Sequence, residues 1–186
     1  MTLSIIKWLA LAPVAMLANF VGYLVAPFVV LFASADGWLP KWLWWFQTPD
    51  YSLDGDYGWM FEHWQFRDKL PRWLAEYVGR VGWLWRNNVY GFDIDVLGAV
   101  AQPGYVFTIK GDAGVSNRPL VAGLVFRIII NPDGKVYWQL YSVKVRDEKY
   151  CWRINLGWKL WNIKDGVSNQ MVVSVNPWMG YMRARA

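Results

Sequence analysis

The sequence predicts an α+β protein that one N-terminal helix holds on a membrane. Residues 8–35 contain no charged side chain, nine of the 15 tryptophans lie between residues 38 and 85, and runs rich in β-branched and aromatic residues follow residue 100. An apolar run of this length is typical of a membrane-spanning helix. Clustered tryptophans are typical of a membrane interface, and the later runs are typical of β-strands. We therefore expect a transmembrane anchor at residues 1–35, a membrane-proximal collar with an acidic loop at 36–70, and a helix with an antiparallel β domain at 71–186.

The uncharged run, WLALAPVAMLANFVGYLVAPFVVLFASA, is long enough for one crossing of a bilayer and too short for two, because each crossing takes about 20 apolar residues. Pro13, Pro27 and the polar Asn19 interrupt it, and membrane helices tolerate such breaks where neighbouring groups satisfy the backbone. The run predicts a single-pass protein of the bacterial inner membrane. Its orientation is undecided, since one lysine, Lys7, precedes the run and one, Lys41, follows it closely.

A cleavable signal peptide is the alternative reading of this run. The sequence ASA at residues 33–35 resembles a cleavage site before Asp36. The apolar region is much longer than the roughly 7–15 residues that such a peptide uses. We therefore favour an anchor.

The segment DGWLPKWLWWFQ follows the apolar run. An indole ring favours the boundary between lipid and water, so Trp38, Trp42, Trp44 and Trp45 are the candidate membrane-interface residues. The alternative is a tryptophan-rich core.

Residues 71–86 predict an amphipathic helix, for which Pro71 suits the first turn. At about 100° per residue, its apolar side chains fall on one arc and most of its charged ones fall opposite. We expect the apolar arc to pack against the sheet, with the bilayer surface as the alternative. The apolar arc comprises Trp73, Leu74, Tyr77, Val78, Val81, Leu84 and Trp85, and the polar side comprises Arg72, Glu76, Gly79, Arg80, Gly82, Trp83 and Arg86.

Five runs after residue 100 predict strands, at residues 105–110, 121–130, 136–146, 151–160 and 170–176. The turn NPDGK joins the second run to the third, with Pro132 at the second turn position and Gly134 in the left-handed conformation. Short links throughout predict an antiparallel meander, as a curled sheet or a small sandwich.

The loop TPDYSLDGDYG resembles the start of a calcium-binding EF-hand loop. Asp50, Ser52 and Asp54 occupy its first, third and fifth positions, and Gly55 the sixth. The twelfth position, which requires an acidic residue, is Phe61. We therefore expect two turns, with Asp50, Ser52, Asp54 and Asp56 as candidate ligands for calcium if a metal binds. No other cofactor is expected.

The sequence offers no catalytic residue. His63 is the only histidine and Cys151 the only cysteine, and neither has the neighbours of a nucleophile, a general base or a zinc site. A packed thiol is the expected state of Cys151. The net charge of +5 is spread along the chain without a Lys/Arg run, so a nucleic-acid partner is not expected.

Several stretches resemble a group of uncharacterised proteins encoded by tailed bacteriophages and prophages, which are small and have an apolar N-terminus. These stretches are GWLPKWLWWFQTPDYSLDGDYGW, LWRNNVYGFD with VLGA, NPDGKVYWQLY and RINLGWKLW. The resemblance runs from about residue 27 to about residue 165. It implies a viral origin and expression in an infected bacterium, and it supplies no activity and no site residues.

Three functions remain open at this point. The first is a membrane-anchored accessory protein that binds the lipid bilayer and a host or phage protein. The second is a membrane-tethered hydrolase or calcium-binding protein that uses the acidic loop at residues 50–56. The third is a component of the virion.

Overall fold

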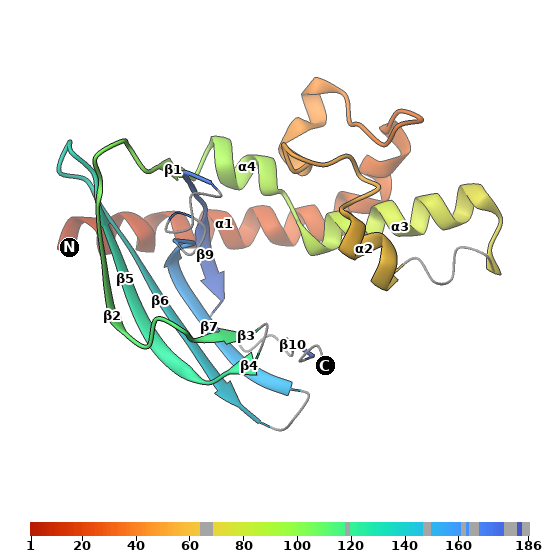
Figure 1. The fold of residues 1–186 in the computed structure, drawn as a ribbon. Helices are drawn as coiled ribbons and strands as arrows, with labels where there is room; N and C mark the ends of the chain where they lie inside the picture. The colour runs from red at the N-terminus through yellow and green to blue at the C-terminus, as the bar shows by residue number, and fades with distance from the viewer. Residues whose placement is uncertain are drawn as a thin grey trace. The chain divides into compact units, whose positions relative to one another are not determined.

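The protein was analysed as a computed structural model, which describes residues 1–63, 69–117, 120–146, 150–160, 163, 168–176 and 182–183. The chain forms two compact units, which Figure 1 shows as a sheet and a group of helices. The sheet unit comprises Met1–Ala15 and Leu97–Ala186, and the helical unit comprises Met16–Val96. The α+β prediction is confirmed, with a long apolar N-terminal helix, shorter helices and a C-terminal antiparallel sheet.

The long helix α1 (Thr2–Val29) contributes its first half to the sheet unit and its second half to the helical unit. A short 3₁₀ segment, η1 (Val30–Phe32), continues it, and the chain leaves the helix where Ala33 takes an extended conformation. Pro13 and Pro27 lie within α1. The interruptions that the sequence contains therefore do not end the helix.

The helical unit also contains shorter helical segments. They are η2 (Lys41–Phe46), α2 (Tyr57–His63), α3 (Arg72–Arg86) and α4 (Tyr90–Asp95). Apolar side chains from α1, η1, η2, α2 and α3 meet in one core with those of two intervening loops. The buried members of this core are Ala26, Val29, Val30, Leu39, Leu43, Leu53, Trp59, Val81, Trp83 and Leu84.

Helix α3 lies where the sequence predicts a helix, but the predicted buried face is wrong in part. Trp73, on the predicted apolar arc, is 69% exposed. Val78 and Trp85, also on that arc, are exposed as well. The buried residues of α3 include three that the arc placed on the polar side, namely Gly79, Arg80 and Trp83.

Two physical effects explain this difference. Glycine allows close approach: a Cβ added at Gly82 would lie 2.9 Å from the ring of Trp59. The charge of Arg80 is compensated by a carboxylate in the same unit, so its burial is not prohibitive. The buried side chains Val81, Trp83 and Leu84 of α3 join the core of the helical unit.

The predicted meander is confirmed as one antiparallel sheet of six strands among the described residues. Its order is β10-β7-β6-β5-β2, and β9 also pairs with β7. Figure 1 shows the long strands of this sheet strongly twisted. The strands are β2 (Val106–Gly111), β5 (Gly123–Ile130), β6 (Val136–Val145), β7 (Tyr150–Trp158), β9 (Val173–Asn176) and β10 (Met182–Arg183).

Two further pairs of very short strands are additions to the prediction. They join β1 (Ala99–Val100) to β8 (Gln170–Met171) and β3 (Ser116–Asn117) to β4 (Leu120–Val121). Strands of two residues leave no recognisable periodicity in a sequence.

The hairpin between β5 and β6 forms at NPDGK as predicted. Ile130 pairs with Val136, the N–H of Gly134 donates to the carbonyl of Asn131 at 2.9 Å, and the N–H of Asn131 donates to the carbonyl of Lys135 at 2.9 Å. Gly134 has a φ of +77°, which is the left-handed conformation that glycine tolerates best. The turn therefore sets the register of the two central strands.

The buried polar groups of the sheet bond to one another across the strands. Arg127 donates to Gln139 at 3.1 Å, and Gln139 donates to Asn155 at 2.9 Å. The oxygen of Gln139 also accepts the N–H of Leu160. Such pairing offsets the cost of burying amides and a guanidinium.

Candidate functional site

Helix α1 presents a broad apolar surface. The helical stretch Thr2–Phe32 has 31 residues and is long and apolar enough to cross a membrane, a property that signal sequences and core helices of soluble proteins share. Fourteen of its large apolar side chains are exposed, and we call them the exposed arc. They are Leu3, Ile5, Ile6, Leu9, Val14, Met16, Leu17, Phe20, Val21, Tyr23, Leu24, Phe28, Leu31 and Phe32.

The buried residues of α1 are smaller, and we call them the covered arc. At about 100° per residue they fall within one sector of the helix, away from the exposed arc. Small side chains allow other elements to approach the helix backbone. The covered arc comprises Ser4, Ala12, Ala15, Gly22, Ala26 and Val29.

The interruption at Pro27 is repaired by a side chain of α3. Proline has no N–H, so the carbonyl of Tyr23, four residues earlier, loses its helical donor. Trp85 Nε1 donates to this carbonyl at 3.1 Å. The hydroxyl of Tyr77 donates to the carbonyl of Pro27, also at 3.1 Å. Helix α3 thus satisfies backbone groups of α1 that a lipid environment would leave without partners.

The turn after α3 also binds α1. Asn88 is buried and donates its side-chain N–H to the carbonyl of Asn19. A Cβ at Gly22 would collide with the side chain of Asn88, so glycine is required for this close approach. The backbone carbonyl of Asn19, in the middle of the apolar run, thus has a partner outside α1.

The four collar tryptophans differ in exposure. Trp38, Trp42 and Trp45 are 41%, 66% and 54% exposed, and Trp44 is half-buried. The ring of Trp42 lies edge-on to Phe32 of the exposed arc, with 5.2 Å between centroids. Three of the four rings are therefore open to a partner, and their contact with lipid stays a prediction.

Buried polar and small residues hold the collar in this position. Gln47 is fully buried, accepts the N–H of Leu39 at 2.8 Å and donates to the carbonyl of Tyr51 at 3.0 Å. Gly91 of α4 would bring a Cβ within 2.6 Å of the carbonyl of Trp44. The short segment η2 is thus packed against its neighbours on both sides, and Trp42 and Trp45 remain exposed.

The acidic loop forms turns, as the sequence predicts, and its side chains bond to nearby backbone groups. The N–H of Asp54 lies 3.4 Å from the hydroxyl of Ser52, and Gly55 has a φ of +85°. Asp56 accepts the N–H of Trp59 at 2.6 Å, close to the start of α2. Asp50 is exposed.

The carboxylate of Asp54 forms an ion pair that the sequence did not predict. Arg80 Nε lies 2.8 Å from Asp54 Oδ1. The same guanidinium donates to the carbonyls of Ser34 and Ala35 at 3.3 and 2.9 Å. We call this group the Arg80 clasp. It joins α3, the acidic loop and the segment after η1 within the helical unit.

No group of three His, Cys, Asp or Glu side chains able to hold a metal occurs within the described part of the chain. Burial raises the pKa of the Tyr90 hydroxyl, and the nearby carboxylates of Asp50 and Asp93 act in the same direction. The carboxylate of Asp54, by contrast, pairs with Arg80. Calcium binding by the loop stays the alternative to the two predicted turns.

The structure tests the prediction for Cys151 but not the one for the side chain of His63. Cys151 is buried at 2% exposure in a core cluster with Val125, Tyr141 and Val143, so the packed thiol is confirmed. The backbone of His63 ends α2, but its side chain lies outside the described part.

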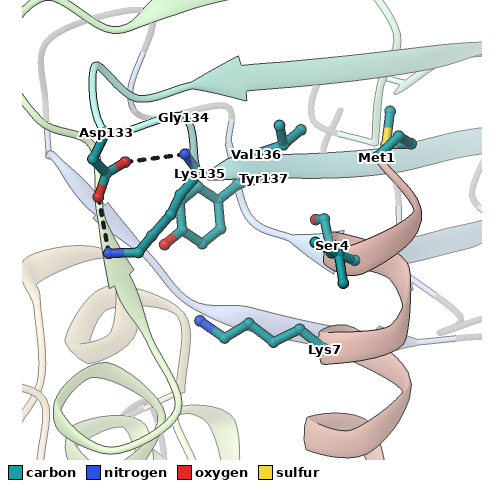
Figure 2. Close-up of a pocket in the computed structure, with 9 residues that line it drawn as sticks. Met1, Ser4, Lys7, Asp133, Gly134, Lys135, Val136 and Tyr137 are labelled. Atoms are coloured by element: carbon teal, nitrogen blue, oxygen red, sulfur yellow. Dashed lines mark hydrogen bonds and ion pairs between the residues drawn. The ribbon is translucent and has the colours of Figure 1, made fainter.

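The sheet unit contains a cavity of about 340 Å³ between the start of α1 and the β5–β6 turn. Figure 2 shows Ser4 and Lys7 of α1 facing the turn residues Asp133 and Lys135, with Tyr137 between them. Lys135 Nζ lies 2.8 Å from Asp133, and its hydrogen bond lowers the pKa of that carboxylate. Burial raises the pKa of the Tyr137 hydroxyl, which therefore stays protonated beside the two amines.

Together these features define an α+β protein with one long apolar helix, an exposed tryptophan collar and no recognised catalytic centre among the described residues. The chain belongs to a family of unknown function, DUF7338, whose model matches residues 1–183. No curated protein and no solved structure matches the chain.

Proposed function

We propose that this protein is a membrane-bound accessory protein of a tailed bacteriophage or prophage, and that it acts as an interaction module at the host inner membrane. It binds the lipid bilayer through α1 and the collar, and it presents its folded surface to a host or phage protein. The viral origin rests on the sequence resemblance. The proposal assigns no catalytic step to the chain.

The exposed arc of α1 is the observation that carries this proposal. A soluble monomer rarely exposes a continuous apolar surface of this size, and a lipid phase removes it from water. The exposed rings of Trp42 and Trp45 follow the helix closely, as expected for residues at a membrane interface. The hydrolase or calcium alternative gains no support from the loop, because Arg80 and the backbone of α2 already engage Asp54 and Asp56.

Membrane fractionation of the full chain, expressed in bacteria, tests the proposal. We expect the protein in the inner-membrane fraction and resistant to alkaline carbonate. Leu17→Glu with Leu24→Glu, both on the exposed arc, should release it, because a charge in the apolar phase is costly. Leu124→Glu is the matched control, since Leu124 is 55% exposed on β5. Full extraction of the unchanged chain by carbonate contradicts the proposal.

Mass spectrometry of the mature protein addresses the signal-peptide alternative. Ala26, Val29 and Val30 belong to the core of the helical unit, so cleavage before Asp36 would remove part of that core. We expect an intact N-terminal helix. A mature chain that begins at Asp36 would favour the signal peptide.

Two geometries keep the chain on the membrane. In the one that the sequence predicts, α1 crosses the bilayer once, with its orientation open. In the other, α1 lies in one leaflet with its exposed arc toward the acyl chains. The two geometries differ in whether both ends of α1 lie on the same side.

A further inference from the structure

We infer that α1 binds one leaflet of a phospholipid membrane from one side and does not cross it. The inference rests on the proposed function and refines it, because it assigns the exposed arc to lipid and both ends of α1 to the same side of the membrane.

Contacts within the sheet unit carry this inference. The ring of Trp8 lies edge-on to Trp138 of β6, with 5.4 Å between centroids, and Trp8 Nε1 donates to the carbonyl of Ser174 on β9 at 3.1 Å. Lys7 Nζ lies 5.6 Å from the centroid of the Tyr137 ring. The first turns of α1 are therefore part of the folded sheet unit.

These contacts, together with the order of the residues along the chain, decide on which side of the membrane each part lies. A single crossing by residues 8–35 would place Lys7 on one side and every residue after 35 on the other. Tyr137, Trp138 and Ser174 would then be separated from Lys7 and Trp8 by the bilayer. A return crossing would need a second apolar segment, and α1 is the one helix long and apolar enough in the described part of the chain. The sheet contact and a single crossing are therefore mutually exclusive.

The two arcs of α1 fit a helix that lies in the plane of one leaflet. Its small residues are buried, and large apolar residues are exposed from Leu3 to Phe32. An interfacial helix of this kind buries one face in the acyl boundary and keeps the other face in polar or protein surroundings. Trp42, which lies against Phe32, extends the apolar surface at its far end.

The two ends of α1 carry few charged side chains. Residues 1–35 contain one, Lys7, and the exposed Asp36 and Lys41 follow the helix. Lys7 Nζ lies over the Tyr137 ring, so Lys41 is the lysine whose exposed side chain can reach the headgroup level. A phospholipid surface is therefore the partner that fits the apolar arc.

Labelling of single cysteines tests the topology in the full-length, membrane-bound protein. Cys151→Ser removes the native thiol, and cysteine is then placed singly at Thr2, Asp36 or Lys144, all of which are exposed. Intact spheroplasts and inverted vesicles are treated with a maleimide that does not cross membranes. We expect all three positions to react from the same side. Reaction of Thr2→Cys from the side opposite to Asp36→Cys and Lys144→Cys would overturn the inference.

A cross-link provides a second, independent measurement. Lys7 and Lys135 line the same cavity of the sheet unit (Figure 2). In Cys151→Ser protein that carries Lys7→Cys and Lys135→Cys, a flexible bismaleimide should join the two thiols while the protein is on the membrane. A chain that is on the membrane but never cross-links contradicts the one-sided geometry. A chain that is absent from the membrane fraction contradicts the proposed function instead, so the two failures are distinguishable.

Discussion

Replacing Arg80 with methionine tests whether the Arg80 clasp stabilises the helical unit. The Arg80 side chain is 11% exposed, and its Nε lies 2.8 Å from the carboxylate of Asp54. It also donates to the carbonyls of Ser34 and Ala35. Methionine keeps an unbranched stem and a similar helix propensity, but it offers no donor. The substitution therefore removes the charge and the hydrogen bonds with little change in packing.

The expected loss of stability follows from the partners of Arg80. Breaking a buried ion pair costs about 3–5 kcal/mol, and hydrogen bonds to charged groups contribute about 1.5–3 kcal/mol. Asp54 is 32% exposed, so water solvates its carboxylate when the guanidinium is lost, and the cost falls below the fully buried range. We expect the free energy of unfolding of the helical unit to fall by about 2–3 kcal/mol.

Denaturant unfolding in mild detergent, followed by far-UV circular dichroism, measures this change. Arg72→Met is the matched control on the same helix, because the side chain of Arg72 is 86% exposed although it pairs with Glu76 at 2.7 Å. Exposed pairs of this kind contribute little, so the control should unfold like the unchanged protein. Equal stability of Arg80→Met and Arg72→Met would refute the reasoning about the clasp.

Four further predictions concern other parts of the molecule. Gly134→Val should destabilise the β5–β6 hairpin by about 1 kcal/mol or more in thermal unfolding, because a β-branched residue resists the positive φ of this position. A steric clash is not the cause, since no atom lies within 4 Å of an added Cβ. Gly134→Asn should cost less, because asparagine tolerates a positive φ better. Trp85→Phe should cost about 1 kcal/mol by leaving the Tyr23 carbonyl without its donor, and an unchanged unfolding midpoint would argue against that bond. Isothermal titration should show calcium binding no tighter than about millimolar, whereas micromolar binding abolished by Asp54→Ala would make the loop a metal site. Brominated lipid should quench Trp42 fluorescence in vesicles, measured as the difference from Trp42→Phe, and no such difference would remove the collar from the membrane.

The strands and the central hairpin were predictable because their signals are local. NPDGK contains every residue that the turn requires, and β-branched runs on both sides supply the strands. The exposed collar also followed from composition, since four tryptophans within eight residues cannot all be buried in so short a segment. These features depend on neighbours in sequence, so the sequence alone was sufficient for them.

The buried face of α3 was not predictable from apolar periodicity. Arg80 is buried because Asp54 and two backbone carbonyls converge on it, and that convergence depends on chain segments far away in sequence. Gly79 and Gly82 did not indicate a buried face, because glycine only weakens the prediction of a helix. Gly79 and Gly82 in fact lie where the helix packs closely: Gly79 is buried, and a Cβ added at Gly82 would lie 2.9 Å from the ring of Trp59.

The two arcs of α1 explain why hydropathy suggested a crossing. Neither the covered arc nor the exposed arc contains a charged residue, and a window average combines both arcs, so hydropathy does not distinguish them. Their sizes differ, and size decides which arc can approach other backbones. Trp8 adds a second signal, because an indole at the start of an apolar helix is expected at a membrane interface, yet here its N–H is bonded to the carbonyl of Ser174. Ser174 is 166 residues away in sequence, and sequence periodicity does not predict contacts between such distant residues. The sorting of side chains by size along α1, together with this one contact, therefore favours a helix whose first turns pack on the sheet unit and whose exposed arc faces lipid.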